Sequence, residues 1–213
     1  DAQESRGLGD VYKRQLLPRS LTALQAGAVP ATALTAWQAL TEHAGVQPGQ
    51  KVLIHAAAGG VGSMAVQIAK YLGAEVIASA SADNHAYLKG LGADQVIDYR
   101  RQDFTQWRPA VDVVLDLVGE QTQALSFALL KRHGVLVSPV SQPDITLAND
   151  YGVTPVNFAT RGDGGQLARI AELFDQGRLQ VAVQAFPLSD APQALEKSRG
   201  RHGHGRLVLD MAR

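Results

Sequence analysis

A turn of small residues, AAGGVG at positions 57–62, is the part of the sequence with the clearest chemical use. An apolar run, VLI at 52–54, leads into it, and a helix pattern that includes Met64 and Ile68 follows it. A strand, a glycine-rich turn and a helix in this order commonly receive a dinucleotide pyrophosphate. Glycines let the backbone approach the phosphates, and the N–H groups and dipole at the helix start attract the anion. The turn therefore predicts a nucleotide site.

The glycine pattern departs from G-x-G-x-x-G at its first position, which is Ala57. A glycine-rich turn without a ligand is the structural alternative. The sequence beyond the turn favours the nucleotide site, because a second apolar strand, EVIASA at 75–80, follows the helix. Strand, helix and strand within about thirty residues make one βαβ unit, whose crossover should be right-handed. The residues of this turn that we expect to contact the cofactor are Ala58, Gly59, Gly60 and Val61.

The end of the predicted second strand bears on the choice between NADP and NAD. In NAD-binding folds an acidic residue about twenty residues past the glycines binds the ribose 2′-hydroxyl, and it would repel a 2′-phosphate. Here the strand ends with Ser79 and Ser81, which favours NADP (NADPH). Asp83 lies just beyond, so NAD is the less favoured alternative. Helix capping is the structural alternative for Ser81 and Asp83.

Composition narrows the class of protein. The chain has 213 residues, 46% of them hydrophobic, and no apolar run near the length of a membrane span, so we expect a soluble protein. The formal net charge is zero, which gives no electrostatic case for nucleic acid or an anionic membrane. Cysteine is absent, so disulfides and thiolate zinc sites are excluded. The polar first residues lack a signal-peptide pattern, and a cytoplasmic location is the expectation.

Two segments precede the turn. Positions 1–15 show neither helical nor strand periodicity and are predicted to be disordered or foreign to the domain. Positions 16–47 are predicted to be connecting helices. Ser20 is the expected N-cap of a short first helix, and Pro30 stands in the first turn of a second helix over 31–43.

Strand and helix patterns alternate after the turn, which predicts an α/β fold with a doubly wound parallel sheet of the Rossmann type over 48–180. Positions 181–213 depart from this alternation and are predicted to form a small α+β tail. Ligands of such sheets bind outside the carboxyl ends of the strands, so positions 57–62, 79–81, 117–119 and 139–141 should surround one site. The further expected strands are 96–97, 111–116, 134–138, 153–158, 181–187 and 206–210, and the further helices are 81–91, 121–132, 166–176 and 190–198.

Five motifs occur in order at sensible spacing: LTAWQAL at 34–40, the glycine turn, LGADQVIDY at 91–99, VVLDLVG at 113–119 and GRLVL at 205–209. Together they resemble the zinc-independent medium-chain dehydrogenases/reductases of the quinone-oxidoreductase-like branch, within the zinc-binding alcohol dehydrogenase superfamily. The resemblance implies a GroES-like substrate domain before the Rossmann domain. This chain lacks nearly all of that domain, so positions 181–213 would be its returning C-terminal remnant and the chain a fragment.

The resemblance also implies a reaction, namely hydride transfer from a nicotinamide to a quinone, enone or similar electron-poor small molecule. The zinc-using branch carries a cysteine about one turn before the position of Thr35, where this chain reads PATA at 30–33, so no zinc is expected. Catalytic residues remain unassigned, and we expect the fragment to be inactive alone. The family often dimerises along the sheet edge, which makes 153–158 the candidate homodimer interface.

Further cofactor contacts follow from the resemblance. Thr35 would lie near the nicotinamide, although a helix hydroxyl bonded to a backbone carbonyl is its structural alternative. Tyr99 would stack near the adenosine, or pack at a strand end. The other implied contacts are Leu117, Val118, Pro139 and Val140 at strand ends, with Phe158 and Ala159 beside the nicotinamide.

Three other functional classes can be compared with these motifs. A non-catalytic NADP(H)-binding sensor module is the alternative that the glycine turn also allows. A short-chain dehydrogenase would need Tyr-x-x-x-Lys, and none of the tyrosines has a lysine four residues later. A P-loop would need Gly-Lys-Ser/Thr after the glycines, which is also missing.

Overall fold

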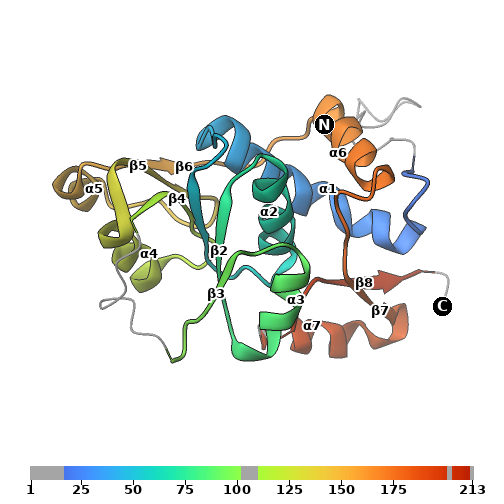
Figure 1. Ribbon diagram of the computed structural model, residues 1–213. Coiled ribbons are helices and arrows are strands. Elements are labelled where there is room, and N and C mark those ends of the chain that lie inside the picture. The colour runs from blue at the N-terminus through green and yellow to red at the C-terminus, as the bar shows by residue number, and fades with distance from the viewer. Residues whose placement is uncertain (1–16, 102–109, 201–202, 212–213) are drawn as a thin grey trace, which may run out of the picture.

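The computed structural model describes residues 17–101, 110–200 and 203–211, so the predicted leader at 1–15 lies outside it. Six parallel strands form one sheet in the order β3-β2-β1-β4-β5-β6 (Figure 1). This is the Rossmann order, and it confirms the predicted fold class. The strands are β1 (Lys51–Ile54), β2 (Glu75–Ala80), β3 (Gln95–Asp98), β4 (Val111–Leu115), β5 (Leu130–Ser138) and β6 (Thr154–Asn157).

Helices cover both faces of this sheet, because its central strands are apolar on both faces. Val52 and Ile54 belong to the larger core cluster, which also takes in side chains of α1 (Ala23–Gln38), α2 (Gly60–Tyr71) and α6 (Gly164–Asp175). Leu53 points to the other face, where Phe127 and Ala148 close a second cluster. The elements on that face are α4 (Glu120–Ser126), η4 (Phe127–Leu129) and α5 (Ile145–Tyr151), while η3 (Ala82–Asn84) and α3 (His85–Gly90) connect β2 to β3.

The segment before the sheet is one helix, so the prediction of two helices was wrong. Thr22, not Ser20, is the N-cap: its hydroxyl accepts from Gln25 N–H, and the Gln25 side chain accepts from Thr22 N–H. Pro30 lies inside α1, where it lacks the N–H of one helical hydrogen bond. Buried side chains on either side of it, including Val29, Ala33 and Leu34, keep the helix continuous against the core.

Other elements also differ from expectation. The helix predicted over 121–132 ends earlier, and Lys131 and Arg132 belong to β5. The Lys131 ammonium lies 2.6 Å from Asp112 Oδ1 on β4, which favours pairing of these strands over a further helical turn. The helix α5 was not predicted. It begins at the N-cap Asp144, whose carboxylate accepts from Leu147 N–H.

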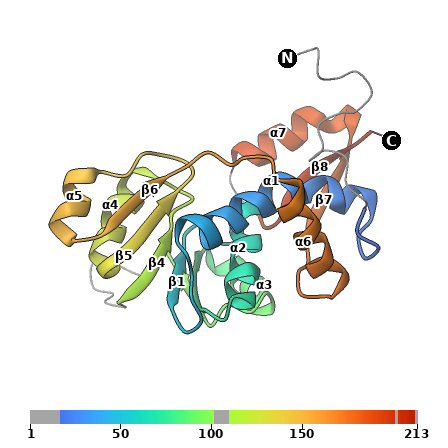
Figure 2. The ribbon, with the colours of Figure 1, turned by 90° about the horizontal axis from the view of Figure 1, so that it is seen from above.

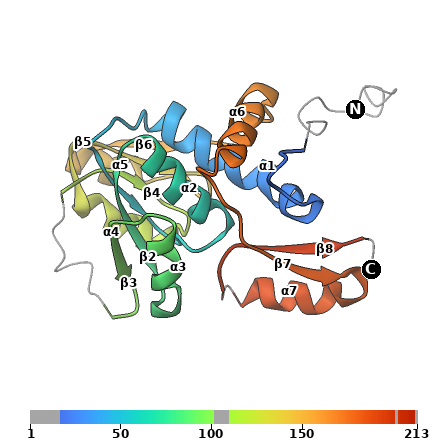
Figure 3. The ribbon, with the colours of Figure 1, turned by 45° about the vertical axis from the view of Figure 1, so that its right-hand side comes forward.

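The C-terminal residues form a separate unit beside α1 (Figures 2 and 3). It contains β7 (Val183–Pro187), η5 (Leu188–Asp190), α7 (Ala191–Arg199) and β8 (Arg206–Asp210). The strands β7 and β8 pair in parallel, with Val183 opposite Arg206. The predicted bounds of β8 agree with the structure. Each helix in the described part of the chain is too short or too polar to span a membrane.

His55 is a buried polar residue directly after β1. Its backbone N–H donates to Leu115 O at 3.0 Å, and its Nε2 lies 2.9 Å from Ser126 Oγ. Since the single proton of that hydroxyl is donated to Thr122 O, Nε2 donates to Ser126. Burial lowers the pKa of His55 from 6.5 to about 4, against the opposing attraction of Asp116.

This pKa predicts acid sensitivity. Between about pH 6.5 and 4 the unfolded chain binds a proton at His55 and the folded chain does not, so stability falls as the pH falls through this window. The loss should approach about 3 kcal/mol at the acid end. Urea unfolding at pH 7 and 4.5 measures it. His55→Gln retains a donor near Nε2 and should flatten the dependence. An equally steep loss in that variant would remove His55 as its source.

Candidate nucleotide-binding site

The glycine turn leads from β1 to the start of α2. Ala57 N–H donates to Ser79 O at 3.1 Å, which joins the turn to the carboxyl end of β2. Gly59 is the N-cap of α2 and supplies no side-chain cap. The first N–H groups of this helix therefore face the carboxyl edge of the sheet with the geometry that suits an anion.

The glycines of the turn have different steric roles. A Cβ on Gly62 would lie 2.4 Å from Ala56 O, so this position requires glycine for the turn to close against its own helix. A Cβ on Gly60 would lie 3.0 Å from Thr32 Cγ2 and 3.1 Å from Arg206 Cδ. Gly60 thus allows α1 and β8 to approach the start of α2.

Arg206 is a site residue that the sequence did not single out. Gly205 N–H donates to Ala58 O at 2.9 Å, and Arg206 N–H donates to Ala182 O at 2.9 Å. These bonds bring an exposed, positively charged side chain beside the helix start, which favours an anion there. Gly205 has a φ of +75°, and a Cβ there would lie 2.3 Å from Ala182 O. In the sequence, the only signal for this close approach is the glycine directly before the arginine.

The predicted adenosine contacts lie on neighbouring strand ends. Ala80 is opposite Asp98 in the β2–β3 register, so Ser81 and Tyr99 follow adjacent strand ends. Ser79 is buried, whereas Tyr99 is 49% exposed and carries the Arg100 guanidinium 5.6 Å from its ring centre. Ser81 Oγ accepts from the Asn84 side chain at 2.9 Å and makes no cap to a helix backbone.

A buried carboxylate shapes the other half of the site. Asp116 follows β4 and is fully buried. Its Oδ1 accepts from Val118 N–H at 3.0 Å and Gly119 N–H at 2.9 Å. Its Oδ2 accepts from Gln123 Nε2 and Ser138 Oγ, both at 3.0 Å. Asp116 therefore sets the conformation of the loop after β4 and joins it to the end of β5.

The network continues to the sheet edge. Ser138 Oγ accepts from Ser141 N–H at 3.3 Å, and Asn157 Nδ2 donates to Ser138 O at 2.8 Å and Ser141 O at 3.1 Å. It thus links the carboxyl ends of β4, β5 and β6. The predicted contacts on these loops are the partly buried Leu117 and Pro139 and the exposed Val118 and Val140.

The remaining predicted contacts lie between α1 and the end of β6. Thr35 Oγ1 lies 2.7 Å from Ala31 O, the helix contact named as its structural alternative, and 2.7 Å from Thr160 Oγ1. Phe158 is buried, and its ring centre is 4.3 Å from that of His43. Ala159 is exposed. Thus α1 passes from the glycine turn to the β6 end and borders both halves of the site.

Two other features lie apart from this edge. An open hollow of about 810 Å³ includes Lys70, Tyr71 and Phe174 and none of the predicted contacts; it lies toward the amino ends of the strands. Within the part of the chain that the structure describes, no group of three or more His, Asp or Glu side chains is placed to hold a metal ion.

Comparison with known proteins identifies the family. A family model described as zinc-binding dehydrogenase matches residues 91–209. The chain belongs to this family, within the medium-chain dehydrogenases/reductases. The resemblance to medium-chain dehydrogenases/reductases of the quinone-oxidoreductase type is confirmed.

Individual relatives are similar over nearly all of the chain. The quinone oxidoreductase from Coxiella burnetii is 38% identical, with a TM-score of 0.83, over 90% of this chain and 62% of its own. Escherichia coli quinone oxidoreductase complexed with NADPH is 30% identical, with a TM-score of 0.84, over 93% and 68%. A segment of polyketide synthase GfsB from Streptomyces halstedii is 39% identical, over 94% of this chain and 4% of that protein. The chain therefore spans only part of its relatives.

The steric demand at Gly62 gives one prediction. Gly62→Ala should destabilise the fold by about 1–3 kcal/mol, because the methyl group meets backbone atoms that cannot move freely. Thermal unfolding measures this. Gly90→Ala is the matched control, since a Cβ there has nothing within 4 Å. Equal stability of both variants would refute the close packing of the turn.

Asp116 gives another prediction. In Asp116→Asn an NH2 group replaces one carboxylate oxygen. At the position of Oδ2 this NH2 group would face Gln123 Nε2 and Ser138 Oγ, which both donate to Asp116 in the parent chain and would lose their acceptor. We expect a loss of about 1–3 kcal/mol in urea unfolding. Asp150→Asn makes the same change at an exposed position of α5 and should be neutral within about 0.5 kcal/mol. A neutral Asp116 variant would contradict the proposed role of the carboxylate.

Proposed function

We propose that this chain is the cofactor-binding part of an NADPH-dependent oxidoreductase that transfers hydride to a quinone, enone or similar electron-poor small molecule. The observation that carries the proposal is the uncapped start of α2 beside Arg206, at the carboxyl edge of a Rossmann sheet. That arrangement fits a pyrophosphate. The likeness to an NADPH-bound quinone oxidoreductase supports both the cofactor and the acceptor.

Different residues of the chain would bind different parts of the cofactor. Gly60 and Val61 would hold the pyrophosphate through backbone N–H groups, with Arg206 as a counter-charge. Ala58 and Gly59 would form the turn before them, in which Gly59 N–H donates to Ala56 O at 3.1 Å. The adenosine would lie over β1–β3, near Ser79, Ser81 and Tyr99. The nicotinamide, which supplies the hydride when bound, would lie over β4–β6. There Leu117, Val118, Pro139 and Val140, together with Thr35, Phe158 and Ala159, would orient its ring and limit the access of water.

The pocket for the hydride acceptor is proposed for the whole protein, not for this chain alone. Since the chain spans less than two thirds of the Coxiella relative, we infer a longer two-domain protein in which residues 48–180 bind the cofactor. Residues 181–213 would complete a GroES-like domain that lines the acceptor pocket. Turnover without zinc, a cytoplasmic location and inactivity of this chain alone are parts of the same proposal.

Dimerisation through the edge of the sheet is a further part of it. In the described sheet β6 is the last strand and pairs on one side only, with β5. Thr154 and Asn157 on it are exposed. A second copy that pairs with this strand would cover an edge that otherwise invites aggregation.

Cofactor titration tests the proposal. NADPH should bind more tightly than NADH, as measured by nicotinamide fluorescence. Ser81→Asp should weaken NADPH by about tenfold and spare NADH, because its carboxylate repels only the 2′-phosphate. Ser198→Asp adds the same charge on α7 and serves as the control. A preference for NADH would assign the ribose to Asp83, and binding of neither cofactor would overturn the proposed function for this chain.

A further inference from the structure

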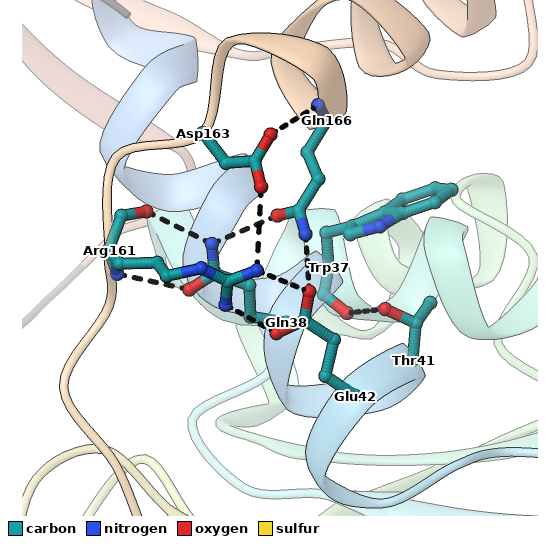
Figure 4. Close-up of polar contacts among 7 residues, drawn as sticks. All are labelled: Trp37, Gln38, Thr41, Glu42, Arg161, Asp163 and Gln166. Atoms are coloured by element: carbon teal, nitrogen blue, oxygen red, sulfur yellow. Dashed lines mark hydrogen bonds and ion pairs between the residues drawn. The ribbon is translucent and has the colours of Figure 1, made fainter.

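The loop between β6 and α6 is held along one face of α1 by a cluster of polar side chains (Figure 4). Gln38 is completely buried in this cluster. Its Nε2 donates to Arg161 O at 3.0 Å, and its Oε1 accepts from Arg161 N–H at 3.1 Å. One amide side chain thus binds both backbone polar groups of Arg161, as a neighbouring strand would.

The Arg161 side chain adds a second attachment. Its Nη1 lies 2.5 Å from Glu42 Oε2 and its Nη2 lies 2.8 Å from Glu42 Oε1, so the two side chains form a bidentate ion pair. Asp163 Oδ2 is 3.4 Å from the same guanidinium. Gln166 accepts from Gln38 and also donates to Glu42, so it closes the ring of contacts. These hydrogen bonds lower the pKa of Glu42, mainly through Arg161.

The spacing of the partners explains how one helix holds a whole loop. Thr35, Gln38 and Glu42 are three and four residues apart and share one helix face. The end of the helix is a π-turn, η2 (Ala39–His43), in which Ala44 N–H donates to Ala39 O at 2.9 Å. Such turns often mark functional sites. His43 lies in this turn and contacts Phe158.

The loop is therefore attached at Phe158, Thr160 and Arg161, on both sides of Ala159. In a Rossmann sheet the adenosine lies over one half of the strands and the second nucleotide over the other. Each of these attachments lies at the β6 end. The described contacts of the cluster reach neither the glycine turn nor the β2 end.

We propose that Gln38 and Arg161 are positioning residues for the nicotinamide. They hold residues 158–160 against α1 and so form the wall of the nicotinamide half before the cofactor arrives, and this inference rests on the proposed function. A loop without these attachments would have to be ordered on binding, at an entropic cost. The adenosine half does not depend on them.

Two ligands distinguish the nicotinamide half of the site from the adenosine half. NADPH fills both, whereas 2′,5′-ADP carries the adenosine with its 2′-phosphate and lacks the nicotinamide. In Gln38→Leu, which keeps the volume and removes both backbone contacts, NADPH should bind about tenfold more weakly, and 2′,5′-ADP should bind as in the parent chain. Isothermal titration of the purified chain measures both. Thr41→Val is the matched control, because the Thr41 hydroxyl bonds only Trp37 O of its own helix among the contacts described.

Arg161→Gln is the second variant, because its side chain is 54% exposed and its loss leaves the core intact. It should show the same selective loss even if Gln38→Leu unfolds, and a thermal melt identifies that case. An equal loss of both ligands in folded variants, or no loss of either, would overturn the positioning role. Failure of the parent chain to bind 2′,5′-ADP would instead count against the proposed function itself.

Discussion

The buried carboxylate of Asp116 is the interaction on which the shape of the β4–β6 half of the site depends. A buried charged group must be satisfied by donors, and four donors from the loop after β4, the helix α4 and the end of β5 converge on it. Because their geometry is set by one acceptor, the loops after β4 and β5 cannot move independently. Ser138 and Asn157 extend this constraint to β6. The exposed apolar side chains of Val118 and Val140 are thereby held at a defined place on an otherwise open edge.

The helix α1 connects this half with the glycine turn. Thr32 approaches Gly60, Thr35 contacts Thr160, and Gln38 binds Arg161. One continuous rigid element thus sets the separation between the region that suits a pyrophosphate and the loop beyond β6. Thr32, Thr35 and Gln38 all follow Pro30, so this separation is set by the part of α1 after the proline.

Features with a local signature were predictable from the sequence. The apolar strands, the glycine turn and β8 each have a short sequence pattern that indicates their conformation. The alternation of strand and helix patterns predicted a doubly wound parallel sheet. Contacts between distant residues had no such signature. Arg206 reads as one more surface cation, Gln38 as one polar residue in a helix, and Asp116 as the end of a strand. Their roles depend on what the fold brings opposite them, as does the continuity of α1 through Pro30. Short elements such as α5 depend on a cap, Asp144, that resembles many loop residues.

The hydrogen bond between Ala58 and Gly205 has a consequence for the order in which the molecule is made. The turn follows the first strand of the sheet, but its partner and Arg206 are among the last residues that the structure describes. A ribosome therefore releases all six strands of the sheet before the segment that carries Gly205 and Arg206. The sheet can therefore pack before the glycine turn gains its bond to Gly205 and the nearby charge of Arg206. A premature stop before Gly205 would leave a packed domain whose turn lacks both this bond and the nearby positive charge.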